Sequence, residues 1–138
     1  MKISNKPVVQ KIIQEFINHG IKNVVFSPGS RNAPFALSFD AHPEIQTHVI
    51  HDERAAAFYA LGMSQTLEQT VALCCTSGSA VLNYYPAVSE AFYREQRLLI
   101  LSADRPKRLI NKGHGQTIMQ DQVFGKHVKS SLSVEDSN

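Results

Sequence analysis

Polar residues suited to binding an acidic ligand follow a short apolar run early in the chain. The segment Ser27-Pro28-Gly29-Ser30-Arg31-Asn32-Ala33-Pro34 comes directly after residues 23–26 and precedes a predicted helix. A turn between a strand and a helix presents free backbone N–H groups, and the helix dipole also favours negative charge there. Arg31 adds a planar fork of donors that fits a carboxylate or a phosphate. The segment therefore predicts an anion site.

Three more polar clusters each follow an apolar run that is typical of a buried parallel strand. The runs are residues 47–50, 71–75 and 98–101, and the clusters are His51-Asp52-Glu53-Arg54, Thr76-Ser77-Gly78-Ser79 and Ser102-Ala103-Asp104-Arg105-Pro106. In open α/β sheets, ligands bind beyond the carboxyl ends of the strands, so we expect all four clusters to share one site. Ordinary turn chemistry explains the serines and glycines, but it does not explain two arginines and a glutamate.

Glu53 is the candidate for proton transfer. It stands between an apolar run and an alanine-rich stretch, where a carboxylate can exchange a proton with a ring nitrogen. The alternative is a glutamate that only complements the dipole of a helix's first turn. Asp52 is the predicted N-cap of that helix.

Arg105 and a group of glutamines are the remaining candidates. Arg105 either forms a second carboxylate clamp facing Arg31 or pairs with its neighbour Asp104 for a structural reason. Amide side chains can donate to or accept from a substrate hydroxyl or carboxylate, although each glutamine taken singly is typical of a surface residue. These glutamines are Gln116, Gln120 and Gln122.

Composition and missing motifs exclude several other classes. There is no Walker A loop and no dinucleotide fingerprint, and the six histidines lack the spacing of metal ligands, so we expect no metal site within the chain. A net charge of +2 with scattered basic residues argues against nucleic acid. No apolar run approaches the ~20 residues of a membrane span, so we expect no membrane insertion. Adjacent Cys74 and Cys75 predict reduced core residues in a cytoplasmic protein.

The elements that position these residues alternate between strand and helix patterns. Helices are predicted over residues 8–17, ended by Gly20, over residues 53–65, and over residues 79–93 with a kink at Pro86. The pattern predicts a doubly wound α/β fold, with a mostly parallel sheet and helices on both faces. We expect residues 1–138 to form one domain that stops before its natural end. Residues 128–134 alternate like an edge strand, and residues 135–138 resemble a frayed end.

Four motifs together resemble one known family. They are the segment 27–34, Asp52-Glu53-Arg54-Ala55-Ala56-Ala57-Phe58-Tyr59-Ala60-Leu61-Gly62, Thr76-Ser77-Gly78-Ser79-Ala80 with Asn83-Tyr84-Tyr85-Pro86-Ala87, and Ala103-Asp104-Arg105-Pro106 with Gly113, Gln116-Thr117-Ile118 and Gln120. The chain resembles the N-terminal, pyrimidine-binding domain of the 2-succinyl-5-enolpyruvyl-6-hydroxy-3-cyclohexene-1-carboxylate synthases. That family acts in menaquinone biosynthesis and uses thiamine diphosphate. The glutamate before an alanine-rich helix is shared with thiamine enzymes in general.

The resemblance implies a transferase that decarboxylates 2-oxoglutarate and adds the succinyl unit to isochorismate. It implies that Glu53 hydrogen-bonds the cofactor's aminopyrimidine and promotes its imino tautomer, with Ser77 and Gly78 also at the cofactor. The same resemblance places substrate carboxylates and hydroxyls on Ser30, Arg31, Arg105 and Gln116. Some family members carry an asparagine where this chain has Gly115, so the resemblance does not carry a substrate contact over to that position.

The resemblance also implies that a second domain and a second subunit complete the site. Thiamine enzymes hold the diphosphate and Mg²⁺ with a Gly-Asp-Gly segment, which does not occur here, so we expect this chain to be inactive alone. Dimerisation is expected through the helices that begin near Glu53 and Ser79, whose small residues allow close contact. These are Ala55, Ala56, Ala57 and Ala80.

Two other functions remain open from the sequence. One is a separate pyrimidine-domain subunit of a two-chain 2-oxoacid decarboxylase, which would act on 2-oxoglutarate without isochorismate. The other is a non-catalytic module that keeps the fold, in which Glu53→Gln would cost no activity in the full-length protein.

Overall fold

A four-stranded parallel sheet forms the centre of the protein in a computed structural model that describes residues 4–135. The strand order is β2-β1-β3-β4, and every neighbouring pair is parallel. The strands are β1 (Asn23–Phe26), β2 (Gln46–Val49), β3 (Val71–Cys75) and β4 (Leu98–Ser102). All four predicted strands are confirmed, with boundaries that differ by one residue at most.

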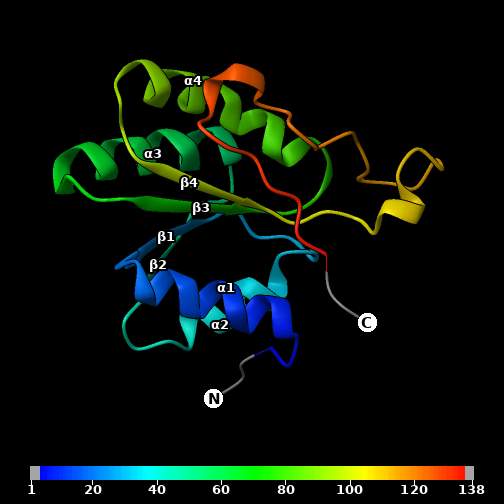
Figure 1. Cartoon of the computed structure of the whole chain (residues 1–138), viewed down its shortest axis with the longest axis horizontal. Helices are drawn as coiled ribbons and strands as arrows, with labels where there is room; N and C mark the ends of the chain where they lie inside the picture. Colours follow the sequence, from blue (N-terminus) through cyan, green and yellow to red (C-terminus); the bar gives the residue numbers. More distant parts are fainter. Residues whose placement is uncertain (1–3, 136–138) are drawn as a thin grey trace.

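The sheet is covered on both faces, which confirms the predicted architecture (Figure 1). The helices α1 (Pro7–Asn18) and α2 (Ala33–Asp40) lie on one face, where Phe16 and Phe39 meet at a ring separation of 5.0 Å. Gly20, just after α1, has a φ of +66°, which suits the predicted glycine stop. The other face is covered by α3 (Glu53–Leu67), the 3₁₀ helix η1 (Gly78–Tyr84) and α4 (Tyr85–Tyr93).

Side chains along the central strand β3 alternate between two hydrophobic cores. Cys74 belongs to the core beneath α1 and α2, and Cys75 belongs to the core beneath α3 and α4. Successive residues of a strand point to opposite faces, so two adjacent cysteines on one strand do not form a disulfide here. Both thiols are free and fully buried, as the sequence predicted.

The prediction of one kinked helix over residues 79–93 is wrong. The chain forms η1 first, and α4 then begins at Tyr85 with Pro86 in its first turn. A proline there loses no hydrogen bond, because the first N–H groups of a helix have no partner within the helix. Pro86 therefore starts a helix rather than bending one.

The predicted edge strand over residues 128–134 is also wrong. After β4 the described chain contains only the short 3₁₀ helices η2 (Lys107–Leu109) and η3 (Gly125–His127). Residues 129–135 are exposed and pair with no strand, and Lys107 Nζ meets Glu135 Oε1 at 2.6 Å. The apolar side chains of Leu132 and Val134 face solvent, so the alternating pattern does not correspond to a strand with one buried face. The rest of the predicted frayed end, residues 136–138, lies outside the described residues. Within residues 4–135, no helix is long and apolar enough to cross a membrane.

Candidate functional site

The four polar clusters lie along one edge of the sheet. Because all four strands are parallel, the residues that follow them meet at the same edge, as predicted. Backbone hydrogen bonds hold the central strand ends level: Ser27 N–H donates to Cys74 O at 2.9 Å, and Ala103 N–H donates to Cys75 O at 3.0 Å. The segment that follows β4 extends beyond this edge (Figure 1).

The strand order reverses between β1 and β3, and two turns meet closely at that point. The turn after β1 is tied to the turn after β3 by the Arg31 backbone N–H, which lies 3.4 Å from Thr76 Oγ1. A Cβ atom placed on Gly29 would lie only 2.4 Å from Thr76 Cβ, so only glycine allows this approach. Such reversal points are the usual ligand crevices of doubly wound sheets.

The segment 27–34, for which the sequence predicts an anion site, exposes the charged side chain of Arg31. Ser30 and Arg31 are exposed, and their side chains make no hydrogen bond or ion pair with the described residues. Beneath them, fully buried Asn32 donates from Nδ2 to Ser27 O at 2.9 Å, while its Oδ1 has no partner. The buried amide holds the turn in place and leaves the Arg31 guanidinium available for a ligand.

Glu53 is the first residue of α3 and is half-buried. Asp52 is the N-cap, as predicted, because its Oδ1 accepts from Ala55 N–H at 2.7 Å. The Glu53 carboxylate makes no hydrogen bond or ion pair with the described residues. Glu53 lies close enough to the end of β3 to influence Cys75. Burial raises the pKa of the Cys75 thiol to about 12, and the nearby charge of Glu53 contributes to this rise. Glu53 is thus a free acceptor that also complements the helix dipole.

Ser77 and Gly78 are buried at the end of β3. The Ser77 hydroxyl has no partner in the described structure. Gly78 has a φ of +86°, and its N–H donates to Gln120 Oε1 at 2.8 Å. The Gly78 N–H is therefore already engaged by the protein, whereas the Ser77 hydroxyl remains available to a ligand.

Arg105 is held by a backbone carbonyl instead of by its neighbouring acid. Its Nη2 donates to Gly115 O at 2.8 Å, and its Nε is buried without a partner. Asp104 Oδ1 accepts from the backbone N–H of Arg105 at 2.7 Å, and no ion pair joins the two side chains in residues 4–135. Gln116 is exposed, with a φ of +55°. The guanidinium of Arg105 therefore keeps donors for an acidic ligand.

Sequence reasoning missed the role of Gln120. A surface position is correct for Gln116 and Gln122, but Gln120 is only 8% exposed and hydrogen-bonds both neighbouring turns. Its place just before the apolar residues Val123 and Phe124 was the available signal, because both lie in or against the core beneath α3 and α4.

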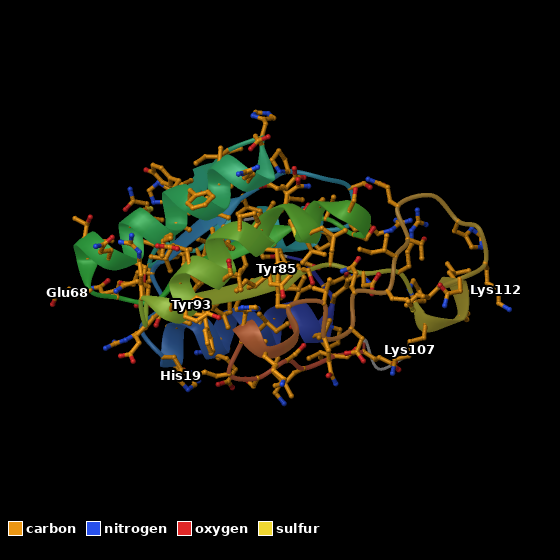
Figure 2. The ribbon with its side chains drawn as sticks, turned by 90° about the horizontal axis from the view of Figure 1, so that it is seen from above. His19, Glu68, Tyr85, Tyr93, Lys107 and Lys112 are labelled. Carbon is orange, nitrogen blue, oxygen red and sulfur yellow. The ribbon has the colours of Figure 1, made fainter. Side chains whose placement is uncertain are left out.

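Two hollows lie away from these residues. A polar one of about 370 Å³ lies near Glu68 and Glu95, and Figure 2 shows Glu68 at the end of the molecule opposite Lys107 and Lys112. An apolar groove of about 430 Å³ runs along α3. Neither hollow is lined by a predicted site residue, so the candidate site rests on the strand ends and not on a cavity.

Three buried polar atoms at the strand ends have no hydrogen-bond partner in the described structure. Asn32 Oδ1, Ser77 Oγ and Arg105 Nε are buried without partners and follow β1, β3 and β4 respectively. A buried polar atom without a partner is costly, and a ligand that supplies the partner recovers that cost. With the Glu53 carboxylate, the set suits an organic ligand that carries both donors and acceptors. No group of three potential metal-ligating side chains occurs within the described part of the chain.

Known proteins match this chain at the level of sequence. Residues 7–124 match the family model described as "Thiamine pyrophosphate enzyme, N-terminal TPP binding domain". A 2-succinyl-5-enolpyruvyl-6-hydroxy-3-cyclohexene-1-carboxylate synthase of Christiangramia forsetii is 52% identical over 97% of this chain and 23% of its own length. The synthase of the same name from Flavobacterium psychrophilum is 52% identical over 88% of this chain and 22% of its own length. The chain thus spans less than a quarter of these relatives.

A solved structure supports the fold. Benzoylformate decarboxylase from Polynucleobacter necessarius superposes with a TM-score of 0.78 over 90% of this chain and 23% of that chain, at 19% identity. The family model covers most of the chain, and the sheet is parallel, as the sequence predicts. The chain therefore belongs to the thiamine pyrophosphate enzyme family, as an N-terminal TPP-binding domain.

Proposed function

We propose that this chain is the pyrimidine-binding domain of a 2-succinyl-5-enolpyruvyl-6-hydroxy-3-cyclohexene-1-carboxylate synthase. The whole protein would release CO₂ from 2-oxoglutarate and transfer the succinyl unit to isochorismate. The observation that carries the proposal is the unpaired Glu53 carboxylate at the start of α3, in a chain about half identical to synthases of that name. We place this reaction in the cytoplasm, in keeping with the free thiols.

The buried polar atoms at the strand ends fit an aminopyrimidine. Such a ring offers N–H donors and nitrogen acceptors, while Glu53 offers a carboxylate and Ser77 a hydroxyl that can donate or accept. When bound, thiamine diphosphate supplies an acidic ring carbon that can attack a 2-oxo acid, a nucleophile that side chains lack. Glu53 would hold a proton at a ring nitrogen, and Gly78 would contribute by allowing close approach of the backbone.

The arginines fit the substrates. 2-Oxoglutarate and isochorismate each carry two carboxylates, and guanidinium groups bind carboxylates through paired donors. We assign this binding to Ser30, Arg31, Arg105 and Gln116, and the partnerless Nε of Arg105 supports the assignment.

We infer that residues outside this chain complete the site. We propose that a domain outside this chain holds the diphosphate and Mg²⁺, and that this chain alone is one incomplete domain without activity. The short span relative to the two synthases supports this division of labour.

A homodimer through the outer face of α3 completes the proposal. Of the expected small residues only Ala55 is exposed, because Ala56, Ala57 and Ala80 are buried in the core. The outer face instead exposes Phe58 and Tyr59 to 42% and 47%, beside the apolar groove that reaches Leu67. Sedimentation velocity should give a dimer that Phe58→Glu dissociates and that Lys11→Glu, on α1, leaves intact. A wild-type monomer at high concentration would count against it.

Turnover by the full-length protein tests the catalytic proposal. With cofactor, Mg²⁺ and both substrates, the wild type should form product, and Glu53→Gln should lower kcat by about 10²–10⁴-fold. Glu44→Gln, which changes an exposed glutamate between α2 and β2, should have no effect. Turnover of 2-oxoglutarate that is indifferent to isochorismate would favour the two-chain decarboxylase. Unchanged activity in Glu53→Gln would favour a non-catalytic role.

A further inference from the structure

Gln120 links three separate segments through one buried amide group. Its Oε1 accepts from Gly78 N–H at 2.8 Å, and its Nε2 donates to Ala103 O at 3.0 Å. Gly78 belongs to the turn after β3, and Ala103 follows β4. The side chain is 8% exposed, so solvent does not replace these bonds. The amide suits this place because it carries a donor and an acceptor on one planar group at any pH.

The same contacts fix the position of Gln116. A Cβ atom placed on Gly78 would lie 3.0 Å from the Gln116 backbone, so Gly78 and Gln116 are in close backbone contact. Gln120 follows four residues later and fastens this segment to the Gly78 N–H. Arg105 fastens the preceding residue by donating to Gly115 O at 2.8 Å. Residues 113–120 contain no helix or strand, so these side-chain bonds do the positioning that regular structure does elsewhere.

We propose that Gln120 is a positioning residue that fixes Gln116 and Arg105 over the strand ends for binding of an anionic substrate. Gln120 itself touches neither substrate nor cofactor. The inference rests on the proposed function for the roles of Gln116 and Arg105, but the tethering of residues 113–120 does not depend on it.

Hydrogen exchange of the unliganded full-length protein tests the tethering. Gln120→Met keeps the length of the side chain and removes both hydrogen bonds. Peptides that cover residues 76–84 and 112–122 should exchange about tenfold faster than in the wild type, while residues 7–18 stay unchanged. Gln65→Ala, which truncates an exposed glutamine on α3, is the matched control and should change neither peptide. Unchanged protection in Gln120→Met would overturn the proposal.

Gln120→Glu adds a readout that a general packing defect would not produce. The ionised carboxylate cannot donate to Ala103 O, but the protonated carboxyl can both donate and accept. Protection relative to the wild type should therefore be lost at pH 8 and regained as the pH falls toward 5. If Gln120→Met fails to fold, this recovery still decides the matter, and its absence would overturn the hydrogen-bonding role.

Steady-state kinetics test whether the two hydrogen bonds of Gln120 affect substrate binding. In Gln120→Met, the KM for the substrate that Gln116 and Arg105 hold should rise about tenfold, with kcat changed less than about threefold. Faster exchange with an unchanged KM would overturn the positioning role. A wild-type protein without synthase activity would instead count against the proposed function, and the exchange result would still stand.

Discussion

Gly29→Ala should destabilise the protein because the two central turns leave no room for a methyl group. The added Cβ would lie 2.4 Å from Thr76 Cβ and 2.7 Å from Thr76 Cγ2. Thr76 is held at the end of the central strand β3, so the turn after β1 has to move. Overpacking of this kind costs about 1–3 kcal/mol, and losing the bond from Arg31 N–H to Thr76 Oγ1 adds about 1 kcal/mol.

We therefore expect Gly29→Ala to lower the free energy of unfolding by about 2–4 kcal/mol. Urea unfolding followed by circular dichroism should show the midpoint falling by about 1–2 M. Gly62→Ala is the matched control: Gly62 lies within α3 and a Cβ there meets nothing within 4 Å. Alanine favours the helix, so Gly62→Ala should stabilise the protein by about 0.5–1 kcal/mol.

If steric crowding at Gly29 is the cause, Gly29→Ala must lower the free energy of unfolding while Gly62→Ala raises it. A Gly29→Ala protein that unfolds at the wild-type urea concentration would show that the turns separate at no cost. The close approach at the β1–β3 crevice would then be no constraint on the site.

Three further predictions concern the cap, the buried thiol and the unpaired hydroxyl. Asp52→Ala should lower the free energy of unfolding by about 1 kcal/mol because Ala55 N–H loses its acceptor; denaturant unfolding measures this, and an unchanged midpoint would contradict it. Burial raises the pKa of the Cys75 thiol from 9.0 to about 12, so the unfolded chain loses a proton that the folded protein keeps. Stability should therefore fall by about 1.4 kcal/mol per pH unit between these values, with a shallower fall in Cys75→Ala. Ser77→Ala should leave the unliganded protein as stable as the wild type or up to about 1 kcal/mol more stable, since it removes a buried partnerless hydroxyl, yet it should weaken thiamine diphosphate binding by the full-length protein in calorimetry. Unchanged affinity would remove Ser77 from the cofactor site.

The strands and their shared edge could be predicted because each strand is short, apolar and followed by polar residues. β3 is buried at every position, and its composition shows this without any knowledge of its neighbours. The start of α3 was equally readable, because Asp52 caps the helix through a bond to a residue only three positions away. Both signals are local in sequence.

The errors arose where local patterns competed with distant contacts. Pro86 reads as a kink within a long apolar stretch, but the 3₁₀ helix before it moves the helix start to Tyr85. Residues 128–134 alternate like a strand, but a strand also needs a neighbouring strand, and none lies beside them in the described structure. Periodicity records which side chains could be buried and not whether a partner is present.

The amino-acid sequence was enough to predict the α/β class and the positions of the strands, and it supplied the candidate site residues Ser30, Arg31, Glu53 and Arg105. These follow from residue types, short-range spacing and the rule that parallel strands end together. The way in which these residues are held in place depends on contacts between distant parts of the chain. Gly29 approaches Thr76, which is 47 positions away in the sequence, and Gln120 forms two hydrogen bonds, one to the end of β3 and one to the end of β4. The Ser77 hydroxyl stays unpaired because of how the surrounding segments pack. Contacts of this kind depend on strand order and packing, and neither leaves a local signal in the sequence.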